Sequence, residues 1–169
     1  MFFRWSPKKP ALVYPVPPAP PTAVLVPWFR PSGHVRVFPG GWDAKAAAFA
    51  PAAIAASWPQ FAALLAQKIP SLTHAAIVLA TSQDQLLTEA RRDRLWHAFR
   101  VPVFEQIVDE DGTLLAAECE AHNGVHIESG ALSLDPSLLN TEPCGCARTT
   151  PQLRRISERV VAAVAAYAR

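Results

Sequence analysis

Residues 114–127 read LLAAECEAHNGVHI, in which two apolar runs flank an Asn-Gly pair. Asn-Gly between apolar runs is typical of a β-hairpin, because the tight turn needs residues that tolerate a positive φ. We therefore expect a two-residue turn at residues 123–124, which places Ala121 opposite His126. Cys119 lies two residues before Ala121 and so shares a face of the hairpin with His126. As diagonal neighbours, these two side chains can close around one ion.

A second pair of cysteines follows the hairpin within the stretch PCGC, residues 143–146. The glycine between Cys144 and Cys146 lets the backbone bend so that both sulfurs face one point. With Cys119 and His126, this knuckle uses all three cysteines of the chain. Three thiolates and one imidazole suit a closed, tetrahedral, structural zinc site. The sequence therefore predicts that Cys119, His126, Cys144 and Cys146 bind a structural Zn²⁺.

Three other interpretations of the same residues stay open. The cysteines can be small buried side chains beside a polar hairpin histidine. A disulfide is disfavoured because residues 1–10 lack the apolar core and cleavage site of a secretory signal, which also leads us to expect a cytoplasmic protein. A catalytic zinc would use the three cysteines and a water, with His126 as a base. A hairpin and a knuckle resemble a zinc-ribbon staple more than an enzyme cleft.

Three segments resemble the phenylacetate-CoA ligase branch of the adenylate-forming enzymes. They are FRVPVFE at 99–105, LAAECEAHNGVH at 115–126 and PCGCARTTP at 143–151. That branch has a helix ending in an "aFgvPvf" strand, an "aaECe…gLHi" hairpin and a "CpCGRt" knuckle. The resemblance covers residues 74–154 and implies the same metal site, in a reduced relative of the ligase core.

The motifs with which such ligases handle ATP have no counterpart here. Residues 106–113 read QIVDEDGT, without the Tyr-Gly-x-Ser/Thr-Glu motif, and residues 128–137 read ESGALSLDPS, without an Arg-Tyr-x-Thr-Gly-Asp motif. The glycine pair at 40–41 belongs to a turn without a lysine, not to a phosphate-binding loop. No catalytic or cofactor-binding residue carries over. We therefore expect a non-catalytic binding or assembly module, the alternative being an acyl-CoA ligase-related enzyme or subunit that completes its active site with another chain.

Composition excludes several classes of function. The chain has 169 residues, half of them apolar, which fits one folded domain. Its net charge of +2, with basic and acidic residues interspersed, gives no case for nucleic-acid binding. The long apolar run at 44–69 contains Lys45, two prolines and many alanines, and does not read as a membrane span.

The order of elements predicts an α/β fold, with a small parallel or mixed sheet flanked by helices and completed by the zinc-stapled hairpin and knuckle. Residues 1–22 form a proline-rich extended arm, and residues 23–169 form a single α/β domain with the Cys3His site at 119–146. The apolar residues of the arm favour docking over free solvation, and packing on its own chain is the default expectation. A protein partner or self-association through the arm or the apolar surface is therefore expected.

Local patterns place the individual elements. Two strands are expected at 23–29 and 34–38, with a turn at 31–33, and a helix or two short helices over 44–69. A buried strand at 74–80 is followed by a helix that a Ser82–Gln85 capping box opens and by a strand at 101–108. A final helix is expected after Thr150 and Pro151. Trp58 and Phe61 are interpreted as core residues and not a ligand clamp. The acidic residues Glu105, Asp109, Glu110 and Asp111 are interpreted as a solvated turn and not a cation site, and His34, His74 and His97 as surface or structural residues.

Overall fold

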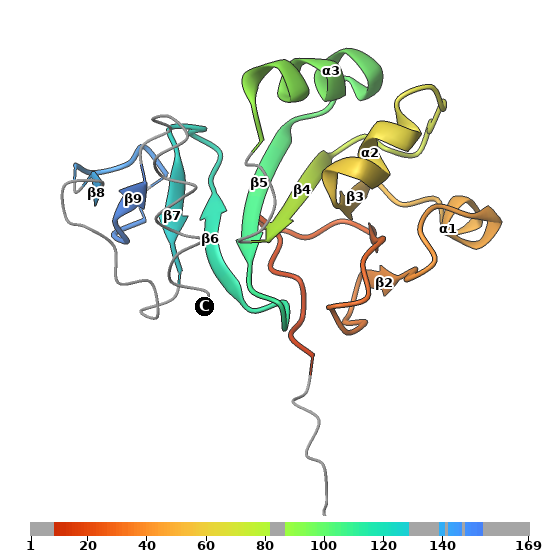
Figure 1. Cartoon of the computed structure of the whole chain (residues 1–169), viewed down its shortest axis with the longest axis horizontal. Coiled ribbons are helices and arrows are strands. Elements are labelled where there is room, and N and C mark those ends of the chain that lie inside the picture. Colours follow the sequence, from red (N-terminus) through yellow and green to blue (C-terminus); the bar gives the residue numbers. More distant parts are fainter. Residues whose placement is uncertain (1–8, 82–86, 129–138, 141, 147, 154–169) are drawn as a thin grey trace, which may run out of the picture.

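The computed structural model describes residues 9–81, 87–128, 139–140, 142–146 and 148–153 (Figure 1). In chain order the elements are β1 (Thr22–Val24), β2 (Val35–Val37), α1 (Ala44–Phe49), β3 (Ala53–Ala56), α2 (Trp58–Leu64), β4 (Ala75–Thr81), α3 (Glu89–Phe99), β5 (Val103–Val108), β6 (Leu114–Glu118), β7 (Val125–Ile127), β8 (Leu139–Asn140) and β9 (Gln152–Leu153). Among these described helices, none has the length and apolar run needed to cross a bilayer.

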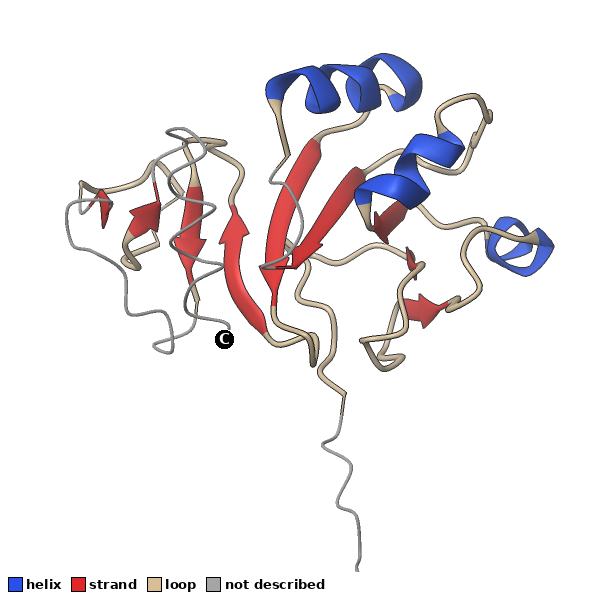
Figure 2. Ribbon diagram, viewed as in Figure 1, coloured by secondary structure: helices blue, strands red, loops and turns tan. Residues whose placement is uncertain are grey.

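All nine strands belong to one mixed sheet in the order β2-β1-β3-β4-β5-β6-β7-β9-β8 (Figure 2). The strands from β2 to β5 pair in parallel, and those from β5 to β8 pair antiparallel. The predicted α/β class and the mixed sheet are confirmed. The change from parallel to antiparallel pairing at β5 separates a helix-flanked half from the half that carries the cysteines.

The parallel half is buried on both faces, as the continuous apolar run of β4 predicts. Ala76 and Val78 point to the face covered by α2 and α3, where they pack with a cluster that includes Phe61 and Leu95. The alternate residue Ile77 points to the opposite face. Because side chains alternate along a strand, each face receives half of the apolar residues of β4.

The N-terminal arm covers the second face of the sheet. Leu12 is buried there, with Tyr14 and Val16 partly buried beside it. The backbone of the arm is also held against the sheet, because the side-chain amide of Gln106 on β5 donates to the carbonyl oxygen of Val13 at 2.7 Å. The arm therefore packs on its own chain from residue 9 onward and leads into β1 at Thr22.

Of the helix or two short helices expected over residues 44–69, the structure has two short helices, α1 and α2, but an unexpected strand, β3, separates them. Residue Ala50 adopts a left-handed conformation, φ 49°, which ends α1, and β3 follows as a strand buried between β1 and β4. Ser57 and Gln60 then form the capping box that begins α2. The alanine-rich sequence favours a helix locally, but Ala53–Ala56 form a strand because their backbone pairs with β1 on one side and β4 on the other, which overrides local propensity.

Three other expectations on local structure need correction. The strands at 23–29 and 34–38 shorten to β1 and β2, and they pair in parallel instead of forming a hairpin. Residues 82–86, with the expected capping box, lie outside the described residues, and α3 begins at Glu89 with Thr88 as its cap. The final helix is wrong at its start, because Gln152 and Leu153 form β9, and its remainder lies outside the described residues.

Candidate metal centre

The hairpin of β6 and β7 supplies two of the four predicted ligands. Ala117 pairs with His126 and Glu118 with Val125, so residues 119–124 form the connecting loop. The expected two-residue turn, with Ala121 opposite His126, is therefore wrong. The register differs from the predicted one by four residues, which is an even number, so each side chain keeps its face of the sheet. Cys119 consequently still shares a face with His126.

The structure brings Cys119, His126, Cys144 and Cys146 together. Their four ligand atoms all lie within 4.8 Å of one another. The sulfurs of Cys119 and Cys144 are 3.6 Å apart, and the sulfur of Cys146 is 3.3 Å from Nε2 of His126. Zinc with bonds of about 2.3 Å to two sulfurs holds them roughly 3.8 Å apart in a tetrahedron, whereas a disulfide needs about 2.05 Å. The three cysteines are free, and the group could hold a metal ion.

A hydrogen bond between Nδ1 and Thr150 orients the His126 ring so that its other nitrogen, Nε2, faces the cysteines. The side chain is fully buried, and Nδ1 lies 3.0 Å from the carbonyl oxygen of Thr150. A carbonyl only accepts hydrogen bonds, so Nδ1 carries the proton. The lone pair is then on Nε2, which faces Cys146. Histidine ligands of metals are commonly held in this way.

The three thiols differ in their electrostatic surroundings. Burial raises the pKa of Cys119 to about 12, because the thiolate there loses its hydration. At the knuckle, the backbone N–H of Cys146 lowers the pKa of Cys144 to about 6. The knuckle does not depend on glycine, since Gly145 has no positive φ and a Cβ there would meet nothing within 4 Å. The bend comes from the turn that Gly145 forms with Cys146.

Two residues outside the predicted ligand set support this centre. Gln152, on β9, is 3% exposed, and its Nε2 lies 3.0 Å from Nε2 of His126. Thr150 holds the other nitrogen of that ring, with its hydroxyl at 3.2 Å as well as its carbonyl. The sequence carries little signal for either role, because a glutamine in an expected helix resembles no metal motif.

A buried carboxylate anchors the strand that leads into Cys119. Glu118 is fully buried and accepts from Nη2 of Arg92 at 2.9 Å and from the backbone N–H of Glu105 at 3.0 Å. Its other oxygen lies 3.1 Å from Nδ1 of His122, whose ring stacks on Phe104. Arg92 belongs to α3 and also donates to the carbonyl oxygen of Val103. The ion pair thus ties the loop that begins at Cys119 to the helical layer.

The other candidate residues lie apart from this group. Glu105 is buried and accepts the backbone N–H of Leu87, while Asp109 Oδ1 accepts the backbone N–H groups of Asp111 and Thr113 within their own turn. The interpretation of the acidic residues as one solvated turn is therefore wrong for Glu105. Phe61 lies in the core with Trp58 packed against it, and His34, His74 and His97 are exposed, as expected.

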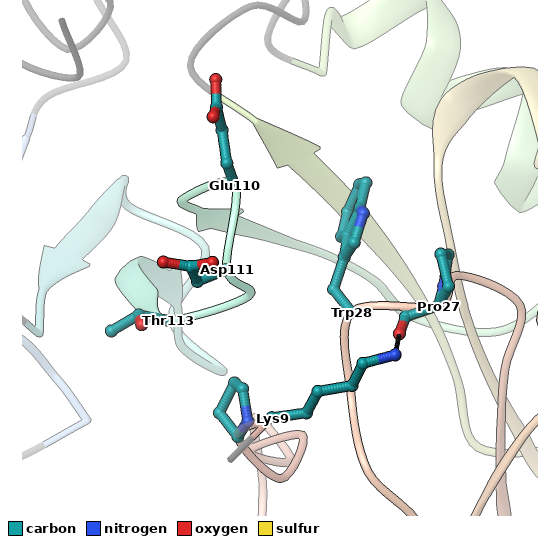
Figure 3. Close-up of a pocket in the computed structure, with 7 residues that line it drawn as sticks. Lys9, Pro27, Trp28, Glu110, Asp111 and Thr113 are labelled. Atoms are coloured by element: carbon teal, nitrogen blue, oxygen red, sulfur yellow. Dashed lines mark hydrogen bonds between the residues drawn. The ribbon is translucent and has the colours of Figure 1, made fainter. Parts of the chain in front are cut away.

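A separate pocket of about 420 Å³ lies where the arm, residues 27–28 and the β5–β6 turn meet (Figure 3). Figure 3 shows Lys9 extending below the Trp28 ring to the carbonyl oxygen of Pro27. Asp111 and Glu110 lie across the pocket from Pro27, to the left in this view. Neither cysteine nor histidine lines this pocket. It is distinct in position and chemistry from the cysteine centre.

Comparisons with known proteins relate the fold to acyl-CoA ligases. No family model and no curated protein sequence matches the chain. Among solved structures, the chain is similar to an open conformation of 2-hydroxyisobutyryl-CoA ligase in complex with 2-HIB-AMP and CoA, with a TM-score of 0.57 and 13% sequence identity. The match covers 79% of this chain and 43% of that ligase. The chain therefore has a fold similar to part of an adenylate-forming acyl-CoA ligase, and spans less than half of that ligase's length.

Proposed function

We propose that this chain is a non-catalytic, zinc-binding module related to the core of phenylacetate-CoA ligase-like enzymes, and that it acts as a binding or assembly component. The observation that carries the proposal is the convergence of Cys119, His126, Cys144 and Cys146 within 4.8 Å. These residues come from two segments of the chain, and they sit on a sheet with the fold of an acyl-CoA ligase.

Zinc is the metal that fits this set of donors best. Thiolates and imidazole are soft or borderline ligands, and three sulfurs with one nitrogen match the composition of structural zinc sites. Cys119 and His126 are fully buried, so the centre leaves little room for a water on their side. Reduced thiols are what a zinc site needs, which is consistent with a cytoplasmic location.

A structural zinc would stabilise the antiparallel end of the sheet. There β7 has three residues and β8 and β9 have two each, packed around a small apolar cluster that includes Ile107, Leu115 and Leu153. Strands this short gain little stability from pairing alone. Structural zinc contributes on the order of 10 kcal/mol to the folding of small metal-dependent domains. An ion that joins β7 to the knuckle would therefore decide whether this end of the sheet folds.

The absence of the ligases' ATP motifs from the sequence supports a non-catalytic role. Residues 109–113, within the stretch where such enzymes carry an adenine-binding motif, form a tight turn in which Asp109 N–H donates to the carbonyl oxygen of Thr113 at 3.0 Å. The alternative is an acyl-CoA ligase-related enzyme or subunit that completes its active site with another chain. The likeness of 79% of this chain to part of an acyl-CoA ligase favours this alternative.

Metal analysis and ligand binding test the proposal together. We expect about one zinc per chain in protein purified without added zinc, and loss of zinc and of folding in the Cys144→Ser, Cys146→Ser double variant. The matched control is His97→Ala, which removes an exposed histidine and should keep its zinc. Full stability of the double variant would count against the metal site.

Calorimetry separates the two candidate functions. A module without catalysis should show no measurable binding of ATP or CoA and should co-purify with a stable protein partner. Measurable ATP affinity of the isolated chain would instead favour the enzyme. Partner contact is proposed through the exposed apolar side chains of the arm and of α3, Val13 and Trp96, which are 52% and 45% exposed.

A further inference from the structure

Gln152 reaches the point on which the four cysteine and histidine ligands converge. In the pairing of β7 with β9, Gln152 lies directly opposite His126, so both side chains project from the same face of the sheet. Nε2 of Gln152 is 3.0 Å from Nε2 of His126, and the sulfur of Cys146 is 3.3 Å from that same ring nitrogen. A buried amide and one of the three sulfurs are therefore both neighbours of the same ring nitrogen.

A zinc ion at this centre would create a demand for hydrogen-bond donors. One Zn²⁺ with three thiolates carries a net charge of −1, and a charge among buried groups is costly unless N–H groups point at it. The backbone N–H of Ala121 serves the sulfur of Cys119, and that of Cys146 serves Cys144. The third sulfur, that of Cys146, lies 3.3 Å from the ring nitrogen of His126 that the Gln152 amide also contacts.

The orientation of the His126 ring determines which acceptor the side-chain N–H of Gln152 has. Nδ1 donates to the carbonyl oxygen of Thr150, so the lone pair of Nε2 accepts from the Gln152 amide in the metal-free arrangement. A metal ion takes that lone pair, and the amide N–H then needs another acceptor. The sulfur of Cys146 lies 3.3 Å from that same ring nitrogen and, as a metal-bound thiolate, accepts hydrogen bonds.

We propose that Gln152 is a positioning residue of the metal centre, whose side-chain amide donates to the sulfur of Cys146 once His126 binds the ion. The inference rests on the proposed metal binding. It makes the centre inert as well as stable, because a thiolate that accepts an N–H bond is a weaker nucleophile toward alkylating agents and oxidants. Gln152 thus favours a structural over a reactive zinc.

The chain offers a matched control in a second buried glutamine. Gln106 is 1% exposed, and its amide donates to the carbonyl oxygen of Val13 in the arm. It lies on β5, two strands away from His126, with Ala117 of β6 between them. Replacing Gln106 removes one buried amide hydrogen bond without removing a neighbour of the sulfurs.

The experiment compares full-length Gln152→Met, Gln152→Glu and Gln106→Met with the unmodified chain, each loaded with Co²⁺ or Zn²⁺. We expect Gln152→Met to bind one metal with roughly 10- to 100-fold lower affinity, as for other residues that support metal ligands. Its sulfur-to-cobalt absorption bands should shift, and iodoacetamide should alkylate the zinc-bound protein several-fold faster. Gln152→Glu should show larger effects, since it adds a negative charge. Gln106→Met should match the unmodified chain.

Nuclear magnetic resonance tests the same bond without any substitution. In the chain loaded with ¹¹³Cd, a scalar coupling between the metal and the Gln152 side-chain N–H is expected through the hydrogen bond to sulfur. Absence of that coupling, or equal alkylation rates and identical cobalt spectra for folded Gln152→Met and the unmodified chain, overturns the role of Gln152 and leaves metal binding intact. Failure of the unmodified chain to bind Co²⁺, Zn²⁺ or Cd²⁺ overturns the proposed function and this inference with it.

Discussion

Arg148 donates from Nη2 to the carbonyl oxygen of Pro15 at 3.3 Å, joining the segment just after the last cysteine to the N-terminal arm. Its Nη1 also lies 2.6 Å from Oε1 of Glu128, next to the end of β7. One guanidinium therefore links three parts of the chain that are distant in sequence. The arm that covers the parallel half of the sheet is tied in this way to the segment that carries Cys144 and Cys146.

Replacing Arg148 by alanine should loosen the arm without unfolding the sheet. The lost bonds are partly exposed, so we expect a cost of about 1 kcal/mol or less. Hydrogen exchange of peptides from residues 10–20 should rise a few-fold, while exchange in β4 and β5 stays unchanged. Arg148→Lys keeps the charge and should give a smaller effect. Unchanged exchange in the arm of Arg148→Ala would show that the apolar contacts of Leu12 hold it alone.

Replacing Glu118 by glutamine should destabilise the protein strongly. The carboxylate is fully buried, and its loss would leave the Arg92 guanidinium without its charged partner. Breaking a buried ion pair by removing one member costs roughly 3–5 kcal/mol. Urea denaturation measures the difference, with Glu120→Gln as the control, since Glu120 is exposed two residues further on. Equal midpoints for the two variants would refute the anchoring role of Glu118.

Replacing Gly112 by alanine should destabilise the protein, whereas replacing Gly145 by alanine should leave its stability nearly unchanged. Gly112 has φ +83°, and a Cβ there would lie 3.0 Å from both Cβ and the carbonyl oxygen of Trp28. Gly112→Ala should therefore cost roughly 1–3 kcal/mol through backbone strain and crowding. Gly145→Ala should be close to neutral, because nothing lies within 4 Å of the added Cβ. Thermal unfolding measures both, and a larger loss for Gly145→Ala would contradict the geometry of the knuckle.

Thiolate absorbance at 240 nm should resolve two very different cysteines in the folded, metal-free protein. One thiolate should form with a midpoint near 6, because the backbone N–H of Cys146 lowers the pKa of Cys144. Another should resist ionisation up to about 12, because Cys119 is buried. Cys144→Ser should abolish the first step and keep the second. Titration of Cys119 and Cys144 together near the ordinary range of a thiol would contradict this arrangement.

The same shifts give opposite contributions to the stability of the metal-free fold. Cys144 has its pKa lowered from 9.0, so its contribution is present above pH 9 and is lost as the pH falls toward 6. Cys119 has its pKa raised from 9.0, so its contribution is present below pH 9 and is lost as the pH rises toward 12. Denaturation of Cys144→Ser and Cys119→Ser across these ranges should show the two opposite slopes disappear one at a time.

The apolar patterns of the sequence predict the elements that are buried on both faces. β4 follows from a continuous apolar run, and the parallel pairing of β4 with β5 follows from the intervening helix. The face shared by Cys119 and His126 also follows, since side-chain alternation survives an even change of register. These features depend on local periodicity, which a sequence records directly.

The elements that the sequence does not predict depend on distant partners. β3 is a strand because β1 and β4 lie on either side of it, although four residues rich in alanine carry no strand pattern of their own. Likewise, β9 has only two residues, and its position beside β7 places Gln152 against His126. Such short strands form through tertiary pairing, which overrides local propensity.

X-ray absorption at the zinc edge tests the central claim most directly. We predict about one zinc per chain, surrounded by three sulfurs at about 2.3 Å and one nitrogen at about 2.0–2.1 Å. The sulfur count should fall by two in the Cys144→Ser, Cys146→Ser variant if any zinc remains bound. A full complement of zinc with only oxygen and nitrogen neighbours, or protein purified without any chelator that is folded and holds no metal, would contradict the account.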